Sequence, residues 1–60
     1  MSSMTERYEH LRRLVEEAAD DIAKTEGGNK AAGTRVRKTM QEVKQAAQDV
    51  RVAVLDARDG

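Results

Sequence analysis

Five cationic residues recur every seven positions in the second half of this 60-residue chain. They are Lys30, Arg37, Lys44, Arg51 and Arg58, here called the basic row. On a heptad helix, residues at this spacing share one edge. Lysine and arginine side chains on such an edge can hold the phosphates of a nucleic acid without reading its sequence. The basic row is therefore a candidate polyanion site.

The start of the same segment, "GGNKAAGTRVRK" (residues 27–38), adds a second reason to expect anion binding. Two glycines and an asparagine predict a helix start, where free backbone N–H groups and the positive end of the helix dipole favour phosphate. The candidate nucleic-acid contacts are Asn29, Lys30, Thr34, Arg35, Arg37, Lys38, Lys44 and Arg51.

Acidic residues decide whether the basic row is free to bind a ligand. Positions of this type commonly form ion pairs with a neighbouring helix. The corresponding row of the first half is Thr5, Arg12, Ala19 and Glu26, which offers one acid. Within the second half, Glu42, Asp49 and Asp56 form a row two residues before the cations, which is expected to weaken the positive potential toward the C-terminus. A solvated or salt-bridged helix face remains an alternative reading.

The charges are separated along the chain although the formal net charge is zero. Residues 1–28 hold four cations and seven acids, a net charge of −3, whereas residues 29–60 hold seven cations and four acids, a net charge of +3. Such asymmetry is typical of nucleic-acid or membrane contact. Attraction between two helices of a hairpin would explain it equally well.

The elements that position these charges are predicted to be two helices. The chain has no proline and a single aromatic residue, which favours an all-α fold. Two apolar series alternate in steps of four and three, as in a coiled-coil seam: Met4, Tyr8, Leu11, Val15, Ala18 and Ile22, then Val36, Met40, Val43, Ala47, Val50, Val54 and Ala57. We expect a single domain over residues 1–60, with helices at about 4–26 and 30–58 joined by a turn at 27–29 into an antiparallel hairpin.

A 60-residue hairpin buries little surface, and without cysteine it has no disulfide to support it. Oligomerisation is the remaining support, so the sequence predicts a homodimer or higher homo-oligomer, most simply a four-helix bundle. A row of small residues beside the expected seam, Thr39, Ala46 and Ala53, would allow another helix to approach. The residues expected at the oligomer interface are Leu14, Val50, Val52, Val54 and Leu55.

Several functions have no support in the sequence. His10 is the sole histidine, and no nucleophile with a base, glycine-rich phosphate loop or metal-ligand spacing is present. We therefore expect no enzyme activity, no metal, no cofactor and no small-molecule substrate. No apolar run is long enough for a signal segment or a membrane span, so a soluble cytoplasmic protein is expected.

The stretch "GNKAAGTRVRKTMQEVKQAAQDVR" (residues 28–51) resembles the N-terminal conserved region of the bacterial linker-histone-like proteins, which include the chlamydial histone-like nucleoid proteins. The resemblance is strongest over residues 27–40. It implies association with double-stranded DNA, nucleoid localisation and compaction of DNA by a helical domain that self-associates. It places these residues on family positions: Gly28, Asn29, Lys30, Ala31, Ala32, Arg35, Val36 and Arg37.

The chain departs from longer members of that family because it ends at "DARDG", without a lysine- and alanine-rich tail. We therefore expect weak DNA binding, binding only as an oligomer, or a role chiefly in assembly. The alternative function is a helical oligomerisation or adaptor module with no nucleic-acid role. Salt-sensitive binding to DNA of random sequence would separate the two hypotheses.

Overall fold

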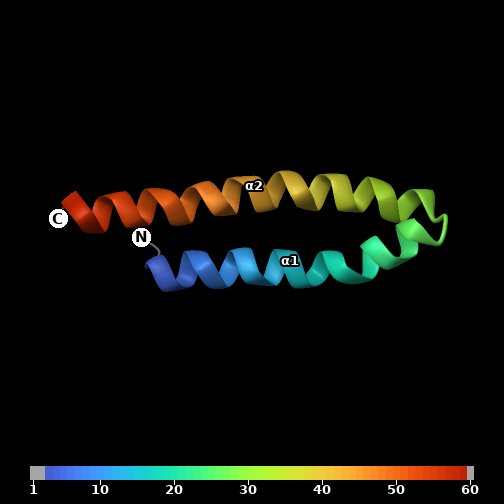
Figure 1. Ribbon diagram of the computed structural model, residues 1–60, viewed down its shortest axis with the longest axis horizontal. Coiled ribbons are helices and arrows are strands. Elements are labelled where there is room, and N and C mark those ends of the chain that lie inside the picture. The colour runs from blue at the N-terminus through green and yellow to red at the C-terminus, as the bar shows by residue number, and fades with distance from the viewer. Residues whose placement is uncertain (1–2, 60) are drawn as a thin grey trace.

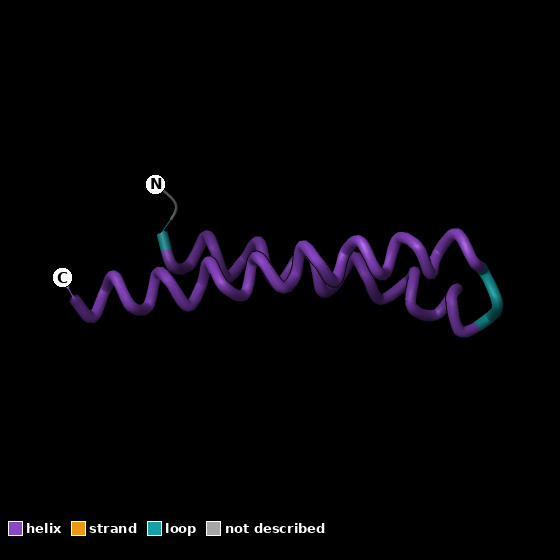
Figure 2. Tube along the Cα trace, turned by 90° about the horizontal axis from the view of Figure 1, so that it is seen from above, coloured by secondary structure: helices purple, strands orange, loops and turns teal. Residues whose placement is uncertain are grey.

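Two antiparallel helices make up the molecule. The computed structural model describes residues 3–59, in which α1 spans Met4–Glu26 and α2 spans Lys30–Asp59. The helices lie side by side in Figure 1 and overlap along their length in the perpendicular view of Figure 2, and the molecule measures 48 × 15 × 14 Å. The expected all-α hairpin is confirmed.

The first helix begins at a capping box. The backbone N–H of Glu6 donates to Ser3 Oγ at 3.1 Å, and the N–H of Ser3 donates to Glu6 Oε1 at 3.2 Å. This reciprocal pair satisfies backbone donors that have no partner within the helix.

The turn between the helices depends on Gly28, whose φ of 101° lies in the left-handed region that favours glycine. The N–H groups of Gly28 and Asn29 donate to the carbonyls of Thr25 and Lys24, each at 3.0 Å, which satisfies the last carbonyls of α1. Asn29 Oδ1 then accepts from the N–H of Ala32 at 3.0 Å and caps α2. The turn thus ends one helix and starts the next within three residues.

Small residues form most of the fully buried part of the contact between the helices. Among the described residues, the buried side chains are Leu14, Ala18, Ala32, Ala46 and Ala53, four of them alanine. On α2 the row of Ala32, Ala46 and Ala53, which Thr39 completes at heptad spacing, faces α1. Because alanine projects little beyond the backbone, this row lets the two helices pack closely. The small residues expected beside the seam therefore form the seam itself.

The observed seam corrects the sequence analysis on α1. Leu14, expected outside the hairpin at an oligomer interface, is only 7% exposed and packs between the helices. Tyr8, Val15 and Ile22, expected in the seam, are exposed. On α1 the column of Leu14 also holds Arg7 and Asp21, which make polar contacts with α2. On α2 apolar or small residues occupy three adjacent heptad columns, so spacing alone allows two seams. The hairpin uses the one that brings Leu14 onto the alanine row of α2.

The second helix is longer than the first and extends beyond it at the end remote from the turn (Figure 1). This overhang carries Val54 and Leu55, both exposed. It therefore leaves apolar side chains that α1 does not cover.

Candidate nucleic-acid interface

The basic row lies on the outer surface of α2. All five of its members are exposed, and none forms an ion pair with a carboxylate that the structure describes. At about 1.5 Å of rise per residue, the row extends over roughly 42 Å with a cation at intervals of roughly 10 Å. The expectation that the hairpin partner leaves these cations free agrees with this placement.

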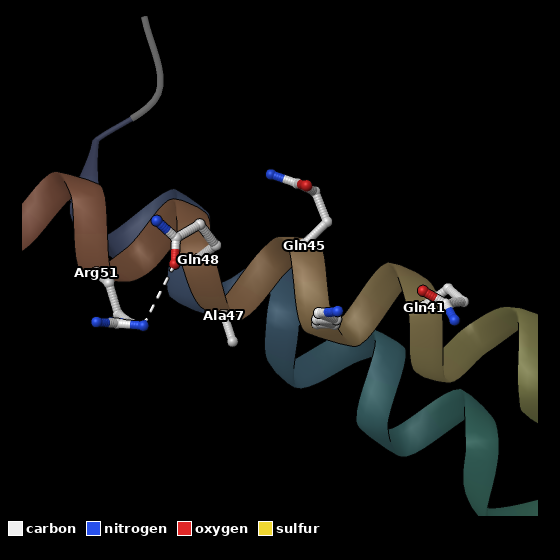
Figure 3. Close-up of a pocket in the computed structure, with 6 residues that line it drawn as sticks. Gln41, Gln45, Ala47, Gln48 and Arg51 are labelled. Atoms are coloured by element: carbon white, nitrogen blue, oxygen red, sulfur yellow. Dashed lines mark hydrogen bonds between the residues drawn. The ribbon is translucent and has the colours of Figure 1, made fainter.

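The row belongs to a wider stripe of α2 that contains no acid. Residues at alternating steps of four and three along this side are Lys30, Thr34, Arg37, Gln41, Lys44, Gln48, Arg51, Leu55 and Arg58. Gln41 and Gln48 line a shallow hollow with Lys44, Arg51 and the small side chain of Ala47 (Figure 3). Arg51 Nη1 donates to Gln48 Oε1 at 3.4 Å. Amide and cationic groups thus stand together, and both can donate hydrogen bonds to phosphate oxygens.

The sequence analysis did not identify Gln41 and Gln48 as candidate contacts. The signal that could have found them is their spacing, because each lies three or four residues from two members of the basic row. Both side chains are uncharged, so a pattern of charges does not include them.

The acids of α2 lie toward the side of the helix away from the basic row. Glu42 precedes Lys44 by two residues, and residues two apart on a helix point in nearly opposite directions. Asp49 from the same acidic row is half-buried near α1, where its backbone carbonyl accepts from Arg7 Nη1 at 2.9 Å. In the described residues none of these acids forms an ion pair with the basic row. The expected weakening of the positive potential toward the C-terminus stays a prediction.

Arg35 is engaged with α1 and is not part of this stripe. Its Nη2 lies 3.0 Å from Asp21 Oδ1, and its Nε donates to both carboxylate oxygens at 3.2 Å. The hydrogen bond from Arg35 lowers the pKa of Asp21, and the same contact raises the pKa of Arg35. Arg35 was listed among the nucleic-acid contacts, but in this structure its guanidinium links the two helices.

The remaining candidates divide between structural and exposed groups. Asn29 uses its side-chain oxygen to cap α2. The hydroxyl of Thr34 donates to the carbonyl of Lys30 at 3.4 Å, within its own helix. Lys38 is exposed but follows Arg37 by one residue, so it points about 100° away from the basic row. The structure thus brings together Lys30, Thr34, Arg37, Lys44 and Arg51 on one stripe, whereas Arg35 and Lys38 point away from it and Asn29 caps the start of the helix.

The outer surface of α1 has a different electrostatic character. Arg12 is held by Glu9 at 2.8 Å and by Glu16 at 2.5 Å. The hydrogen bond from Glu9, with the nearby charge of Glu16, raises the pKa of Arg12. A cation held between two carboxylates in its own helix is a poor phosphate ligand, so Arg12 is not among the candidate contacts.

Two other kinds of site are not seen in the described residues. Over this part of the chain, no group of three or more histidine, cysteine or acidic side chains is arranged to hold a metal ion. Neither described helix has a stretch long and apolar enough to cross a membrane.

A comparison with protein families gives a match over almost the whole chain. Residues 5–60 match the family model described as "Histone H1-like protein Hc1", which covers both helices and the turn. Neither the curated proteins nor the solved structures include a significant match to this chain.

Proposed function

The chain belongs to the histone H1-like protein Hc1 family, and from this premise we propose that it is a nucleoid-associated protein that binds double-stranded DNA through the basic row of α2. The observation that carries the proposal is the exposed, acid-free stripe that contains Lys30, Arg37, Lys44 and Arg51. The stripe offers cationic and amide groups spread over roughly 42 Å of α2, which suits contacts to successive phosphates. Binding is therefore to the phosphate backbone and is independent of sequence.

The proposal includes self-association in the bacterial cytoplasm. A single hairpin presents one stripe and can only coat a duplex, whereas an oligomer carries several stripes and can hold separate segments together. A thin, alanine-rich hairpin core supports the same conclusion, because a domain this small needs further burial for stability.

The test is a salt titration of binding to duplex DNA of random sequence. The logarithm of the binding constant should fall linearly with the logarithm of salt concentration. The slope should lie between about −1.8 and −4.5, for two to five phosphate contacts per chain. Binding that is absent at low salt, or that does not weaken with salt, would show that the proposal is wrong.

A matched pair of variants locates the site. Arg37→Gln with Lys44→Gln removes two charges from the basic row, and Arg13→Gln with Lys24→Gln removes two charges from α1. Both pairs change the net charge equally. We expect the first pair to reduce the salt slope by about 1.8 and the second to leave it nearly unchanged. Equal losses would indicate that net charge alone, and not the stripe, determines binding.

The second candidate function is an oligomerisation or adaptor module without a nucleic-acid role. The exposed apolar side chains outside the hairpin seam are the observation that favours it. Under this hypothesis the chain self-associates, yet the salt titration shows no DNA binding.

A further inference from the structure

Exposed apolar side chains gather on one side of the hairpin. Six of them, each between 38% and 53% exposed, form what we call the apolar face: Met4, Tyr8, Val15, Ile22, Met40 and Val54. On α1, Tyr8, Val15 and Ile22 form the heptad column that the hairpin seam leaves unused, and Met4 extends the seam column of Leu11 and Ala18 at the start of the helix. On α2, Met40 and Val54 belong to one such unused column. Both helices therefore contribute to a single unfilled surface.

Contacts across the seam show that these columns lie on the same side. The polar cross-links, Arg35 to Asp21 and Arg7 to the Asp49 carbonyl, run along one side of the seam. On the other side, a Cβ placed on Gly33 would lie 3.4 Å from Thr25 Cγ2. Gly33 shares the heptad column of Met40 and Val54 on α2. The apolar face is thus opposite the polar cross-links.

We propose that a second copy of this chain covers the apolar face, forming a four-helix bundle in which both turns lie at the same end. This inference rests on the self-association in the proposed function and names its surface and symmetry. An isologous dimer pairs one patch with itself, and an apolar face spread over both helices is suited to that packing. Leu14, buried within the hairpin, and Val52, beside Arg7 and His10 on the polar side, are not part of this surface.

Charge along the two edges of the face selects the arrangement. The basic row borders the face on α2, because Arg37, Lys44 and Arg51 each lie three residues before a member of the Met40 and Val54 column. If α2 packed beside α2 of the second copy, five cations would lie along five cations. Packing beside α1 instead places them next to an edge whose Arg12 is held by Glu9 and Glu16. Avoiding like-charge contact favours the pairing of α1 with α2.

The overhang of α2 favours the same arrangement. When α1 of one copy lies on α2 of the other, face to face, the two-fold axis runs along the hairpins and both turns fall at one end. Both overhangs then meet at the other end, where Val54 of each copy can face its counterpart (Figure 1). With turns at opposite ends, each overhang would extend past the partner's turn and stay uncovered.

This symmetry has a consequence for DNA. The two copies of α2 occupy diagonal corners of the bundle, so their basic rows follow opposite edges. One dimer therefore presents two separate stripes and can hold two duplexes.

The arrangement is tested on the DNA-free protein. A nitroxide spin label on Glu26→Cys, next to the turn, should show an intermolecular distance below about 30 Å, because bundle helices pack 8–10 Å apart. A monomer over the micromolar range overturns the dimer. A distance approaching the 48 Å length of the hairpin overturns the shared-end arrangement. This measurement does not require a substitution in the face.

Substitutions test the face itself. Val15→Glu or Met40→Glu would bury a carboxylate and should weaken the dimer by more than about a hundredfold in sedimentation equilibrium. The matched control is Val52→Glu, an exposed valine on the polar side, which should change the dissociation constant by less than about threefold. Equal effects of the two kinds of variant overturn the proposed face.

The proposed dimer interface and the proposed DNA binding can be disproved independently. Val15→Glu should still bind a single duplex with a salt-dependent constant, because it leaves the basic row intact. A wild-type dimer that binds no DNA would remove the proposed DNA function and keep the interface. DNA binding by a wild-type protein that stays monomeric would keep the proposed DNA function and remove the proposed interface.

Discussion

Arg35 and Arg37 show how two residues of the same type, two positions apart, serve different purposes. Arg35 forms an ion pair with Asp21 across the hairpin. Arg37 is exposed on the opposite side of α2, within the acid-free stripe. Since residues two apart point in nearly opposite directions on a helix, the charge-rich string that contains them is divided by the fold.

This division predicts different effects for the same substitution. Arg37→Gln should weaken DNA binding by roughly fivefold at low salt, because an exposed charge contributes about 1 kcal/mol. The same substitution should reduce the salt slope by about 0.9. Arg35→Gln should have little effect on the slope and should lower the melting temperature. Fluorescence anisotropy and thermal melts of both variants measure the two effects. A larger loss of binding for Arg35→Gln would show that its ion pair opens on DNA.

The Asp21–Arg35 pair also predicts a pH dependence of stability. Because the hydrogen bond from Arg35 lowers the pKa of Asp21 in the folded state, the pair stabilises the fold fully above the ordinary aspartate value of 3.8. The contribution is lost as the pH falls through the lower folded value. Wild type should therefore melt above Asp21→Asn at pH 7, and the difference should vanish in strong acid.

The control for this pH dependence is Asp20→Asn, which removes an adjacent carboxylate that has no cross-helix partner in the described residues. Thermal melts from pH 2 to 7 compare the three proteins. If the gap between wild type and Asp21→Asn is the same at pH 2 and pH 7, the pair does not stabilise the fold through charge.

At the scale of the helices, the ends were more predictable than the seam. Ser3, Gly28 and Asn29 have chemistry that suits few other positions, and the structure uses each as a cap or a turn residue. The seam was ambiguous on α2 because apolar or small residues fill three adjacent heptad columns there, and spacing alone cannot choose between two pairs of them. The close approach allowed by Ala46 and Ala53 favours the observed pair and brings Leu14 into the seam, although its column also holds Arg7 and Asp21.

The candidate site also contained predictable and unpredictable residues. The basic row could be predicted from its spacing alone, since each member stays exposed whichever seam forms. The ion pair of Arg35 and the half-buried position of Asp49 depend on which columns face α1, so the sequence could not assign them.

Two glycines predict opposite responses to alanine. Gly28→Ala should destabilise the hairpin by about 1 kcal/mol, because its φ of 101° is unfavourable for a residue with a Cβ, although nothing lies within 4 Å. Gly33→Ala should stabilise it by about 0.5–1 kcal/mol, since alanine favours the helix and its Cβ would make an ordinary 3.4 Å contact with Thr25 Cγ2. Urea denaturation measures both changes. Destabilisation by Gly33→Ala would show that the helices cannot accommodate that methyl group.

At the scale of the whole molecule, the hairpin separates three surfaces: the basic row, the polar cross-links and the apolar face. The basic row and the apolar face share an edge along α2, so the proposed DNA contacts and the proposed dimer interface lie on the same helix. In the proposed dimer, this places the two DNA-binding stripes on opposite edges of one rigid bundle.

A dimer with two opposed stripes predicts a maximum in bridging as protein concentration rises. At low ratios each added dimer can join two duplexes, whereas in excess each duplex becomes covered by its own dimers and the links are lost. Retention of a fluorescent duplex on beads that carry a second duplex should therefore rise and then fall. Val15→Glu should retain none while still binding single duplexes, and Val52→Glu should follow wild type. Retention that rises without a maximum would indicate polymerisation along DNA in place of discrete two-duplex bridges, because only a closed dimer runs out of free stripes.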